Sequence, residues 1–560
     1  MLLVLRNRFF RLILLGVPLA VLTACGDGFH TPPGPLAAFE NQSLPWKTCD
    51  PLSFGPEHQD WFEAVDFRAR CAVMRAPRDY ARPNAGEIAI QLVMIPAGEP
   101  RQRQGAILLN PGGPGADGAS LPFIIGLPWI QADPADPIGA LYRQIAQRYD
   151  LVGFDPRGTG ASTRLACADE VALRFIANPA RDRSPENTAN MLYNSRAIAE
   201  ACQDDPLLPH INSDATARDM DLLRHLLGDE RLNYIGISYG TWLGNWYASL
   251  FPGRVGRMLL NAMMDVTQPM NSQNLPQEGR WQGVLDEVVL PYASRHPQRF
   301  LLGEQPQAIR QRLDRLSSPL HAALVSSLKV AVSRSSEVDR GLLAIRAADV
   351  IQGELDLDPA IAEQALRARL EGYAWVPDPA LKAVAEEEAS KLITAYFQQV
   401  HEEVPTFPPP AYGSTMHWAV VYNDSGTPYT PDTWIAASTD NAWRYPEFGG
   451  FWRQNPTLYW HFPLVTRPPQ ELAALAGPLL VLQTEGDPMT DLAGARNSLV
   501  VLPNARLIEI RGDYTHGPTV PYGTDCVDRP IAEYFLYGTL PPAETPCPGL
   551  PLAADTEGRQ

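Results

Sequence analysis

One pentapeptide constrains the fold of this chain more than any other segment. Residues 236–240 read Gly-Ile-Ser-Tyr-Gly, follow an apolar, β-branched run from Leu232 and precede a helix-compatible run that continues through Tyr247. A strand, a sharp turn and a helix in this order are typical of a nucleophilic serine, because a hydroxyl is a poor nucleophile that needs exposure, a base and nearby amide donors. The same pattern also arises by chance in glycine-rich chains, so other residues must decide whether Ser238 is catalytic.

Two later loops contain the partners that such a serine requires. An apolar strand over 478–483 is followed by Asp487, and the next strand, over 505–510, is followed by His516. Serine, acid and histidine in this order are typical of an α/β-hydrolase. We therefore predict that Ser238 attacks a carbonyl carbon, that His516 moves the proton and that Asp487 orients the imidazole. Taken singly, the acid is equally compatible with a turn and the histidine with a surface loop.

A glycine-rich loop predicts the oxyanion hole. The apolar run over 106–109 opens into Asn-Pro-Gly-Gly-Pro-Gly at residues 110–115. Loops of this composition expose backbone amides, and amides beside a nucleophile stabilise the negative charge of a tetrahedral intermediate. We expect the amides of Gly113 and Tyr239 to do so. The alternative is a tight turn that binds nothing.

The order of the segments predicts an α/β fold. Apolar strand runs alternate with helical segments as far as residue 261, which is typical of a mostly parallel sheet. From 265 to 470 the pattern is mainly helical and has no buried β run, which predicts a helical cap inserted into the sheet. Asp358-Pro359 and Asp378-Pro379 each predict a helix that begins after the aspartate. The expected divisions are a signal peptide (1–24), a tether (25–45), a first core part (46–264), the cap (265–470) and a second core part (471–550).

The end of the cap is rich in aromatic residues. These rings are expected either in the core of the cap or in a wall over the active site, and the sequence favours neither position. They are Trp418, Tyr422, Tyr429, Trp434, Trp443, Tyr445, Phe448, Phe451, Trp452, Tyr459 and Trp460.

The N-terminus predicts export and lipidation. Three arginines precede an apolar run over 12–22, which is followed by Thr-Ala-Cys-Gly with the cysteine at Cys25. This arrangement is typical of a secretory signal and resembles a bacterial lipobox, in which the thiol carries the lipid. A transmembrane anchor is the alternative, but the run is shorter than the roughly 20 residues that a span needs. We expect a lipid-anchored protein of the bacterial cell envelope, on its periplasmic or extracellular face.

Six cysteines remain in the expected mature chain, and an even number in an exported protein predicts disulfides. Proximity in sequence favours the pairs Cys49 with Cys71, Cys167 with Cys202, and Cys526 with Cys547, among fifteen possible connectivities. A metal site is the competing interpretation, and it is weak because the sequence has no CxxC or HxxxH spacing. No metal or cofactor is expected. The formal net charge of −17 also argues against a nucleic-acid partner.

The motifs together resemble the proline iminopeptidase and tripeptidyl aminopeptidase family of α/β-hydrolases. The resemblance runs from Trp46 to Cys547 and is most specific at NPGGPG (110–115), DLVGFDPRGTGAS (150–162) and GISYGT (236–241). It implies an exported serine hydrolase without a cofactor that cleaves peptides or short esters. Two features depart from the usual pattern: Tyr422 stands where family members often carry a cysteine, and residues 261–265 replace a more usual Asp-Gly stretch.

The resemblance implies an aminopeptidase, of tripeptidyl or prolyl type, that acts on a small peptide. Such an enzyme must bind a free ammonium, and Asp424 of the cap is the expected carboxylate, although Asn-Asp-Ser-Gly is also a typical turn sequence. A carboxylesterase with the same triad, acting on short-chain or lipid-like esters, is the first alternative. An inactive binding lipoprotein on a hydrolase fold is the second. The sequence does not predict the oligomeric state.

Overall fold

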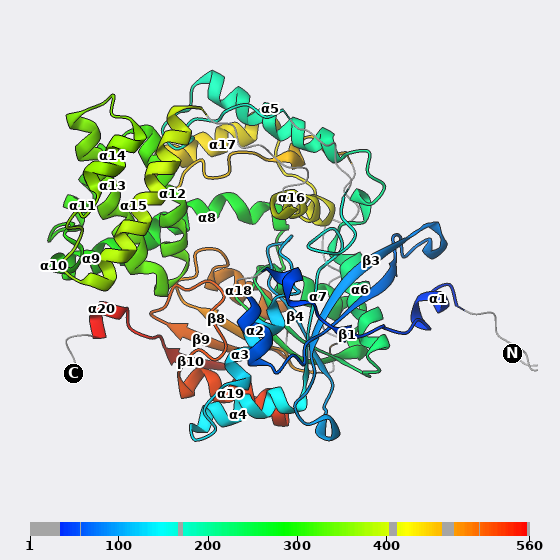
Figure 1. The fold of residues 1–560 in the computed structure, drawn as a ribbon. Helices are drawn as coiled ribbons and strands as arrows, with labels where there is room; N and C mark the ends of the chain where they lie inside the picture. Colours follow the sequence, from blue (N-terminus) through cyan, green and yellow to red (C-terminus); the bar gives the residue numbers. More distant parts are fainter. Residues whose placement is uncertain are drawn as a thin grey trace, which may run out of the picture.

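A ten-stranded sheet lies below a thick layer of helices in the computed structural model of the chain (Figure 1). The structure describes residues 34–55, 58–165, 172–402, 412–461, 475, 477–502 and 504–556. The strand order is β1-β2-β3-β5-β4-β6-β7-β8-β9-β10. The first three pairings are antiparallel and the other six are parallel, so the expected mostly parallel sheet is confirmed. The strands are β1 (Lys47–Thr48), β2 (Arg70–Pro77), β3 (Glu87–Ile95), β4 (Ala106–Asn110), β5 (Asp150–Phe154), β6 (Leu232–Ile237), β7 (Val255–Asn261), β8 (Leu480–Thr484), β9 (Arg506–Arg511) and β10 (Glu544–Pro548).

Side chains on the two faces of the sheet enter two separate cores. Successive residues of a strand point to opposite faces, so Leu108 packs with α6 (Ser213–Leu226) and α7 (Tyr239–Leu250). Its neighbours Ile107 and Leu109 pack on the other face, with α3 (Leu121–Ile130), α4 (Pro137–Arg148) and α19 (Asp525–Tyr537). Burial on both faces explains why the central strands are continuous apolar runs.

Between β7 and β8 the described residues form helices and connecting turns (Figure 1). These helices enclose a third core, centred on α12, α13 and α15. The helices are α8 (Asn274–Val284), α9 (Leu290–Arg295), α10 (Pro297–Phe300), α11 (Pro306–Arg315), α12 (Ser318–Ser333), α13 (Val338–Leu357), α14 (Glu363–Leu370), α15 (Pro379–Val400), α16 (Tyr412–Ser425) and α17 (Pro431–Arg444), with an intervening π-helical turn at Leu285–Val289.

A segment between β5 and β6 also packs on this helical layer. Helix α5 (Pro185–Cys202) runs beside α17 at the top of the molecule (Figure 1). Just before it, Arg183 donates to Thr439 of α17, and Asn178 contacts His321 of α12 at 2.8 Å. The cap layer is therefore assembled from two stretches of the chain that lie on either side of the serine turn.

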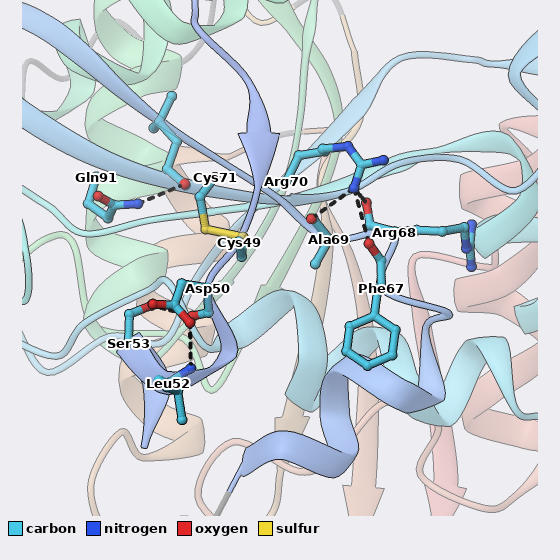
Figure 2. The surroundings of a disulfide bond; sticks show 11 residues. Cys49, Asp50, Leu52, Ser53, Phe67, Arg68, Ala69, Arg70, Cys71 and Gln91 are labelled. Atoms are coloured by element: carbon cyan, nitrogen blue, oxygen red, sulfur yellow. Dashed lines mark hydrogen bonds between the residues drawn. A yellow bond between two sulfur atoms is a disulfide. The ribbon is translucent and has the colours of Figure 1, made fainter. Parts of the chain in front are cut away.

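Two disulfides link chain ends to the sheet. Cys49 is bonded to Cys71, which joins the short edge strand β1 to β2, and Cys526 is bonded to Cys547, which joins α19 to β10. Figure 2 shows the first, with the nearby Arg70 guanidinium donating to three carbonyls of the preceding loop. Cys202 is also disulfide-bonded. Its expected partner, Cys167, lies outside the described residues, as does Cys25.

The C-terminal segment returns from the sheet to the cap. After β10, the short helix α20 (Ala553–Thr556) lies beside α9 and α10 (Figure 1). Ala554 N donates to the Tyr292 hydroxyl at 2.9 Å. The Asp555 carboxylate lies 2.7 Å from the His296 ring and 3.0 Å from the Arg295 guanidinium. The cap is thus attached to the sheet by this tail as well as by its own two connections.

Candidate active site

Ser238 occupies the sharp turn between β6 and α7. Its backbone has φ 56° and ψ −119°, a strained conformation of the kind that costs of order 1–3 kcal/mol and clusters at functional sites. Its amide donates to the Asn261 carbonyl at 2.9 Å, which holds the turn against β7. The side chain stands partly exposed at the first turn of α7.

The two glycines of the pentapeptide allow the strand and the helix to approach each other. A Cβ on Gly236 would lie 2.4 Å from the Gly240 carbonyl oxygen, and a Cβ on Gly240 would lie 2.9 Å from the Asn110 carbonyl oxygen. Both distances are too short for carbon and oxygen. Any larger residue would therefore force the helix away from the strand ends.

Asp487 and His516 meet at the ends of β8 and β9. Nδ1 of His516 lies 2.9 Å from Oδ2 and 3.0 Å from Oδ1 of Asp487. The carboxylate is buried, and its Oδ1 also accepts the amides of Met489 and Thr490 at 2.8 and 3.0 Å. These bonds fix the carboxylate, and its contact with Nδ1 leaves the Nε2 atom of the imidazole available for a proton transfer.

Asn261, the last residue of β7, connects the serine turn with the histidine loop. Its carbonyl accepts the Ser238 amide, and its side-chain amide donates to the Pro518 carbonyl at 2.8 Å. Gly517 packs so closely that a Cβ on it would lie 2.7 Å from the Ile237 side chain. The structure therefore brings the three residues of the predicted triad to the same end of the sheet.

The glycine-rich loop lies directly against the serine turn. Gly112 has φ 96°, and a Cβ on it would lie 3.2 Å from the Tyr239 nitrogen and 3.1 Å from the Ser238 Cβ. Gly113 follows with φ 102°. Tyr239 begins α7, and the first amides of a helix have no acceptor within it. The two predicted oxyanion donors thus belong to two segments that touch beside the serine.

Comparison with known families agrees with this arrangement. A family model described as "alpha/beta hydrolase fold" matches residues 105–348, and a second, described as "TAP-like protein", matches residues 445–547. The first match contains the serine turn and the second contains the acid and the histidine. The chain has the α/β-hydrolase fold.

Curated relatives of this hydrolase include peptidases and an esterase. It is 27% identical to "Tripeptidyl aminopeptidase" of Streptomyces lividans, over 85% of this chain and 83% of the relative. It is also 27% identical to "Serine protease Hip1" of Mycobacterium tuberculosis, over 86% and 87%. Its identity to "Carboxylesterase B" of the same organism is 28%, over 96% of both chains. The resemblance to the tripeptidyl aminopeptidase family is confirmed.

Asp424 of the hydrolase has a position unlike the expected one. It lies within α16, fully buried, and its oxygens accept the Ser213 amide at 2.8 Å, the Ser213 hydroxyl at 2.5 Å and the Trp242 indole at 3.0 Å. Burial raises its pKa to about 7, against the opposing effect of these bonds. Because both oxygens are used inside the protein, the expectation that Asp424 binds a substrate ammonium is wrong. Its bonds join α16 to α6 and α7 instead.

The motif at 150–162 supports the site from within the hydrolase core. Arg157 donates from Nε and Nη2 to both oxygens of Asp219 at 2.8 and 2.7 Å, and both side chains are buried. Asp155 accepts the amides of Gly118 and Ala119, each at 3.0 Å. The motif therefore connects the loop after β5 with α6 and with the segment just before α3.

His417 lies against the glycine-rich loop and packs with other cap residues. His417 hydrogen-bonds to the Gly113 backbone, and burial lowers its pKa to about 4. Its ring stacks on Trp452, with the centroids 5.8 Å apart. Lys329 places its ammonium over the same tryptophan ring, 5.8 Å from the centroid. Trp452 therefore lies on the side of the cap that faces the glycine-rich loop, and it also packs against the buried cap cluster that contains Trp434.

Lys329 was not among the site residues predicted from the sequence. A lysine in the apolar helix 318–333 is usually a solvated residue on the outer face. Only the tertiary structure shows that Ser333, one turn later on the same face, accepts the His516 amide at 2.8 Å through its carbonyl. This bond places that face of α12 next to the histidine loop.

Proposed function

We propose that this hydrolase is an exported aminopeptidase that uses Ser238, His516 and Asp487 as a catalytic triad. The contact of His516 with Asp487, beside a strained serine turn, is the observation that carries the proposal. His516 removes the proton from Ser238 as the hydroxyl attacks the substrate carbonyl carbon, while Asp487 stabilises the imidazolium.

The rest of the cycle uses the same groups. The amides of Gly113 and Tyr239 donate to the oxyanion of the tetrahedral intermediate, each worth about 3 kcal/mol of transition-state stabilisation. His516 then gives its proton to the leaving amine, which departs and leaves the acyl group on Ser238. Water, deprotonated by the same imidazole, hydrolyses that acyl-enzyme and regenerates the hydroxyl.

The peptidase assignment is supported by the relatives named tripeptidyl aminopeptidase and serine protease, which match more than four fifths of the chain. A large cap also suits a short peptide. A cavity of about 500 Å³ lies between α12, α15 and the segment 447–454, and binding sites for small ligands commonly have volumes of 300–1,000 Å³.

A carboxylesterase is the second candidate, and one observation favours it. The aminopeptidase needs a carboxylate to pair with a substrate ammonium, yet Lys329, one helical turn before the Ser333 carbonyl that accepts the His516 amide, is a cation. A relative named carboxylesterase, covered over 96% of its length, supports the same interpretation.

Labelling and substrate profiling test the proposal. We expect a fluorophosphonate probe to label the wild-type protein and to leave Ser238→Ala unlabelled, with the circular dichroism spectrum unchanged. Free aminoacyl and tripeptidyl nitroanilides, their N-acetylated forms and short-chain nitrophenyl esters then separate the two candidates. A strong preference for the free amine supports the aminopeptidase, and efficient turnover of esters alone supports the esterase. Labelling that persists in Ser238→Ala would exclude both.

Membrane attachment is a separate proposal, which rests on the sequence alone. We propose that the protein is exported and anchored by a lipid on Cys25, within the arrangement that resembles a lipobox. Among the described residues, no helix combines the length and apolar character needed to cross a bilayer.

A further inference from the structure

The cap cavity has a positively charged, aromatic lining. Its wall includes Phe451, Trp452 and Trp418, together with Arg453 and, on the segment before α5, Arg174. The chain as a whole has a formal charge of −17. An excess of cations at one cavity is therefore opposite in sign to the net charge of the protein. A concave site of this kind attracts anions.

Arg453 has no acidic partner among the described residues. In the described part of the chain, no carboxylate lies at ion-pairing distance from its guanidinium, although burial is sufficient to lower its pKa. Arg174 is exposed, and its guanidinium lies 3.9 Å from the centre of the Tyr193 ring. Burying a guanidinium without a carboxylate costs free energy. The Arg453 guanidinium can therefore still bind a bidentate acceptor such as a carboxylate.

Lys329 extends this charge towards the predicted triad. Its ammonium lies 4.1 Å from the centre of the Phe451 ring and 4.8 Å from that of Trp281, and 5.8 Å from that of Trp452. No described carboxylate pairs with it, and burial lowers its pKa to about 8. The rings stabilise the ammonium only in part, since a cation over an aromatic face gains about 0.5–2 kcal/mol.

The two acids at or near the cavity have partners of their own. Glu447 lies 2.7 Å from the His321 ring and 2.9 Å from the Arg310 guanidinium. Glu278, behind Trp452, accepts the Asn441 side-chain amide at 2.8 Å and the Trp452 amide at 3.3 Å. Neither carboxylate neutralises Arg453 or Lys329 directly.

We propose that the cavity and the Lys329 ammonium form a subsite for a carboxylate, so that the preferred substrates of this hydrolase carry an anionic acyl group. Substrates of this kind are half-esters of dicarboxylic acids, or peptides with an acidic side chain on the acyl side of the bond that breaks. The inference rests on the proposed function of Ser238, because it concerns the group transferred to that serine. It applies to the aminopeptidase and to the esterase alike, since the charge is recognised at a distance from the bond that breaks.

Matched nitrophenyl esters test the proposal. Mono-p-nitrophenyl glutarate carries a free carboxylate, and its methyl ester is a neutral compound with the same acyl chain. We expect the wild-type kcat/KM to be at least ten times higher for the anionic ester. Lys329→Gln and Arg453→Gln should each reduce this ratio at least fivefold. Succinate and adipate analogues show which chain length reaches the subsite best.

Charge-conserving and surface variants control for misfolding. Lys329→Arg and Arg453→Lys keep the positive charge and should retain most of the preference. Lys382→Gln and Arg444→Gln remove partly or fully exposed cations from α15 and α17 and should leave the ratio unchanged. Equal turnover of the two esters by the wild type, or a ratio unaffected by both neutral variants, would overturn the proposal.

A binding measurement separates this inference from the proposed function. Glutarate is titrated into Ser238→Ala, and binding is followed by tryptophan fluorescence, because Trp281 and Trp452 lie against Lys329. Saturable binding that Lys329→Gln or Arg453→Gln weakens at least fivefold supports the subsite even if no ester is hydrolysed. No binding by glutarate, succinate or adipate, together with no preference in turnover, overturns it.

Discussion

Arg157 and Asp219 form a bidentate ion pair in which each side chain is only 1% exposed. The two residues come from the loop after β5 and from α6, and the guanidinium also donates to the carbonyls of Pro77, Arg78 and His210. Each nitrogen of the Arg157 guanidinium therefore donates to at least one acceptor. The pair joins the sheet, the edge strands and the helix that precedes the serine strand.

Removing one partner should be strongly destabilising, because it leaves the other charge buried. We expect Arg157→Met to lower the free energy of unfolding by about 3–5 kcal/mol, measured by urea unfolding with tryptophan fluorescence. Arg75→Met is the matched control, since Arg75 and Glu87 are both half exposed, and it should cost less than about 1 kcal/mol. Similar losses in the two variants would contradict a structural role for the buried pair.

Asp424 should make stability depend on pH in a defined direction. Burial raises its pKa to about 7, from 3.8 in an unfolded chain, so between these values the folded state holds a proton that the unfolded state has released. The free energy of unfolding should therefore fall as the pH rises from 4 to 7. Asp424→Asn cannot ionise and should show a smaller fall.

Burial also raises the pKa of Glu278 to about 7. Part of the pH dependence should therefore remain in the Asp424→Asn variant. The exposed Asp432→Asn is the control and should behave like the wild type. Urea unfolding at pH 4.5, 6 and 8 measures the effect. Parallel curves for wild type and Asp424→Asn would show that this carboxyl titrates normally.

The preference for anionic esters should weaken as the pH rises through 8. Burial lowers the pKa of Lys329 to about 8, so the ammonium loses its proton there and no longer attracts a carboxylate. His417, from α16, has a pKa of about 4 and stays neutral in this range. Glu278, from α8, ionises near 7 and acts in the same direction.

The Lys329→Arg variant distinguishes the effect of Lys329 from that of Glu278. It removes the group that loses its proton near pH 8 and leaves the ionisation of Glu278 in place. We expect the ratio of kcat/KM for the anionic and neutral glutarate esters to fall between pH 7.5 and 9 in the wild type. In the arginine variant the ratio should stay level over that interval. A fall of equal size in both proteins would assign the effect to another group.

Cys25→Ala tests the proposed lipid anchor. The thiol is the expected point of lipidation, so its loss should move the protein from the membrane fraction to the soluble fraction. Cell fractionation with immunodetection measures this, and metabolic labelling with a clickable fatty acid should mark only the wild type. If the alanine variant still sediments with membranes, another attachment holds it.

The sequence predicts those parts of the site that local pattern determines. Ser238, Asp487 and His516 each follow an apolar strand, and parallel strands end at the same edge of a sheet, so their order predicts that the three residues lie at one end of the sheet, where Asp487 and His516 are in contact. Asp378 likewise caps α15 as its Asp-Pro sequence indicates. These features depend on neighbours within a few residues.

Features that depend on distant partners were not predictable in this way. Asp358, also followed by proline, ends α13 instead of beginning a helix, and its carboxylate pairs with Arg369. Asp424 lies in a sequence typical of a turn, yet it belongs to a helix whose buried face contacts Ser213. Lys329 acquires its importance only from rings that are about fifty to over a hundred residues away.

The C-terminal tail limits how the cap moves. It runs from β10, which is bonded through Cys547 to α19, to the contacts of Asp555 with α9. A lid attached to the sheet only by its chain connections would swing about them, but the contact of the tail with α9 is a further attachment that opposes the swing. We therefore expect substrates to reach Ser238 through rearrangement of side chains and loops, with the cap helices in place. The shape and charge of a permanently open entrance to Ser238 would then select the substrates, without a closure of the cap.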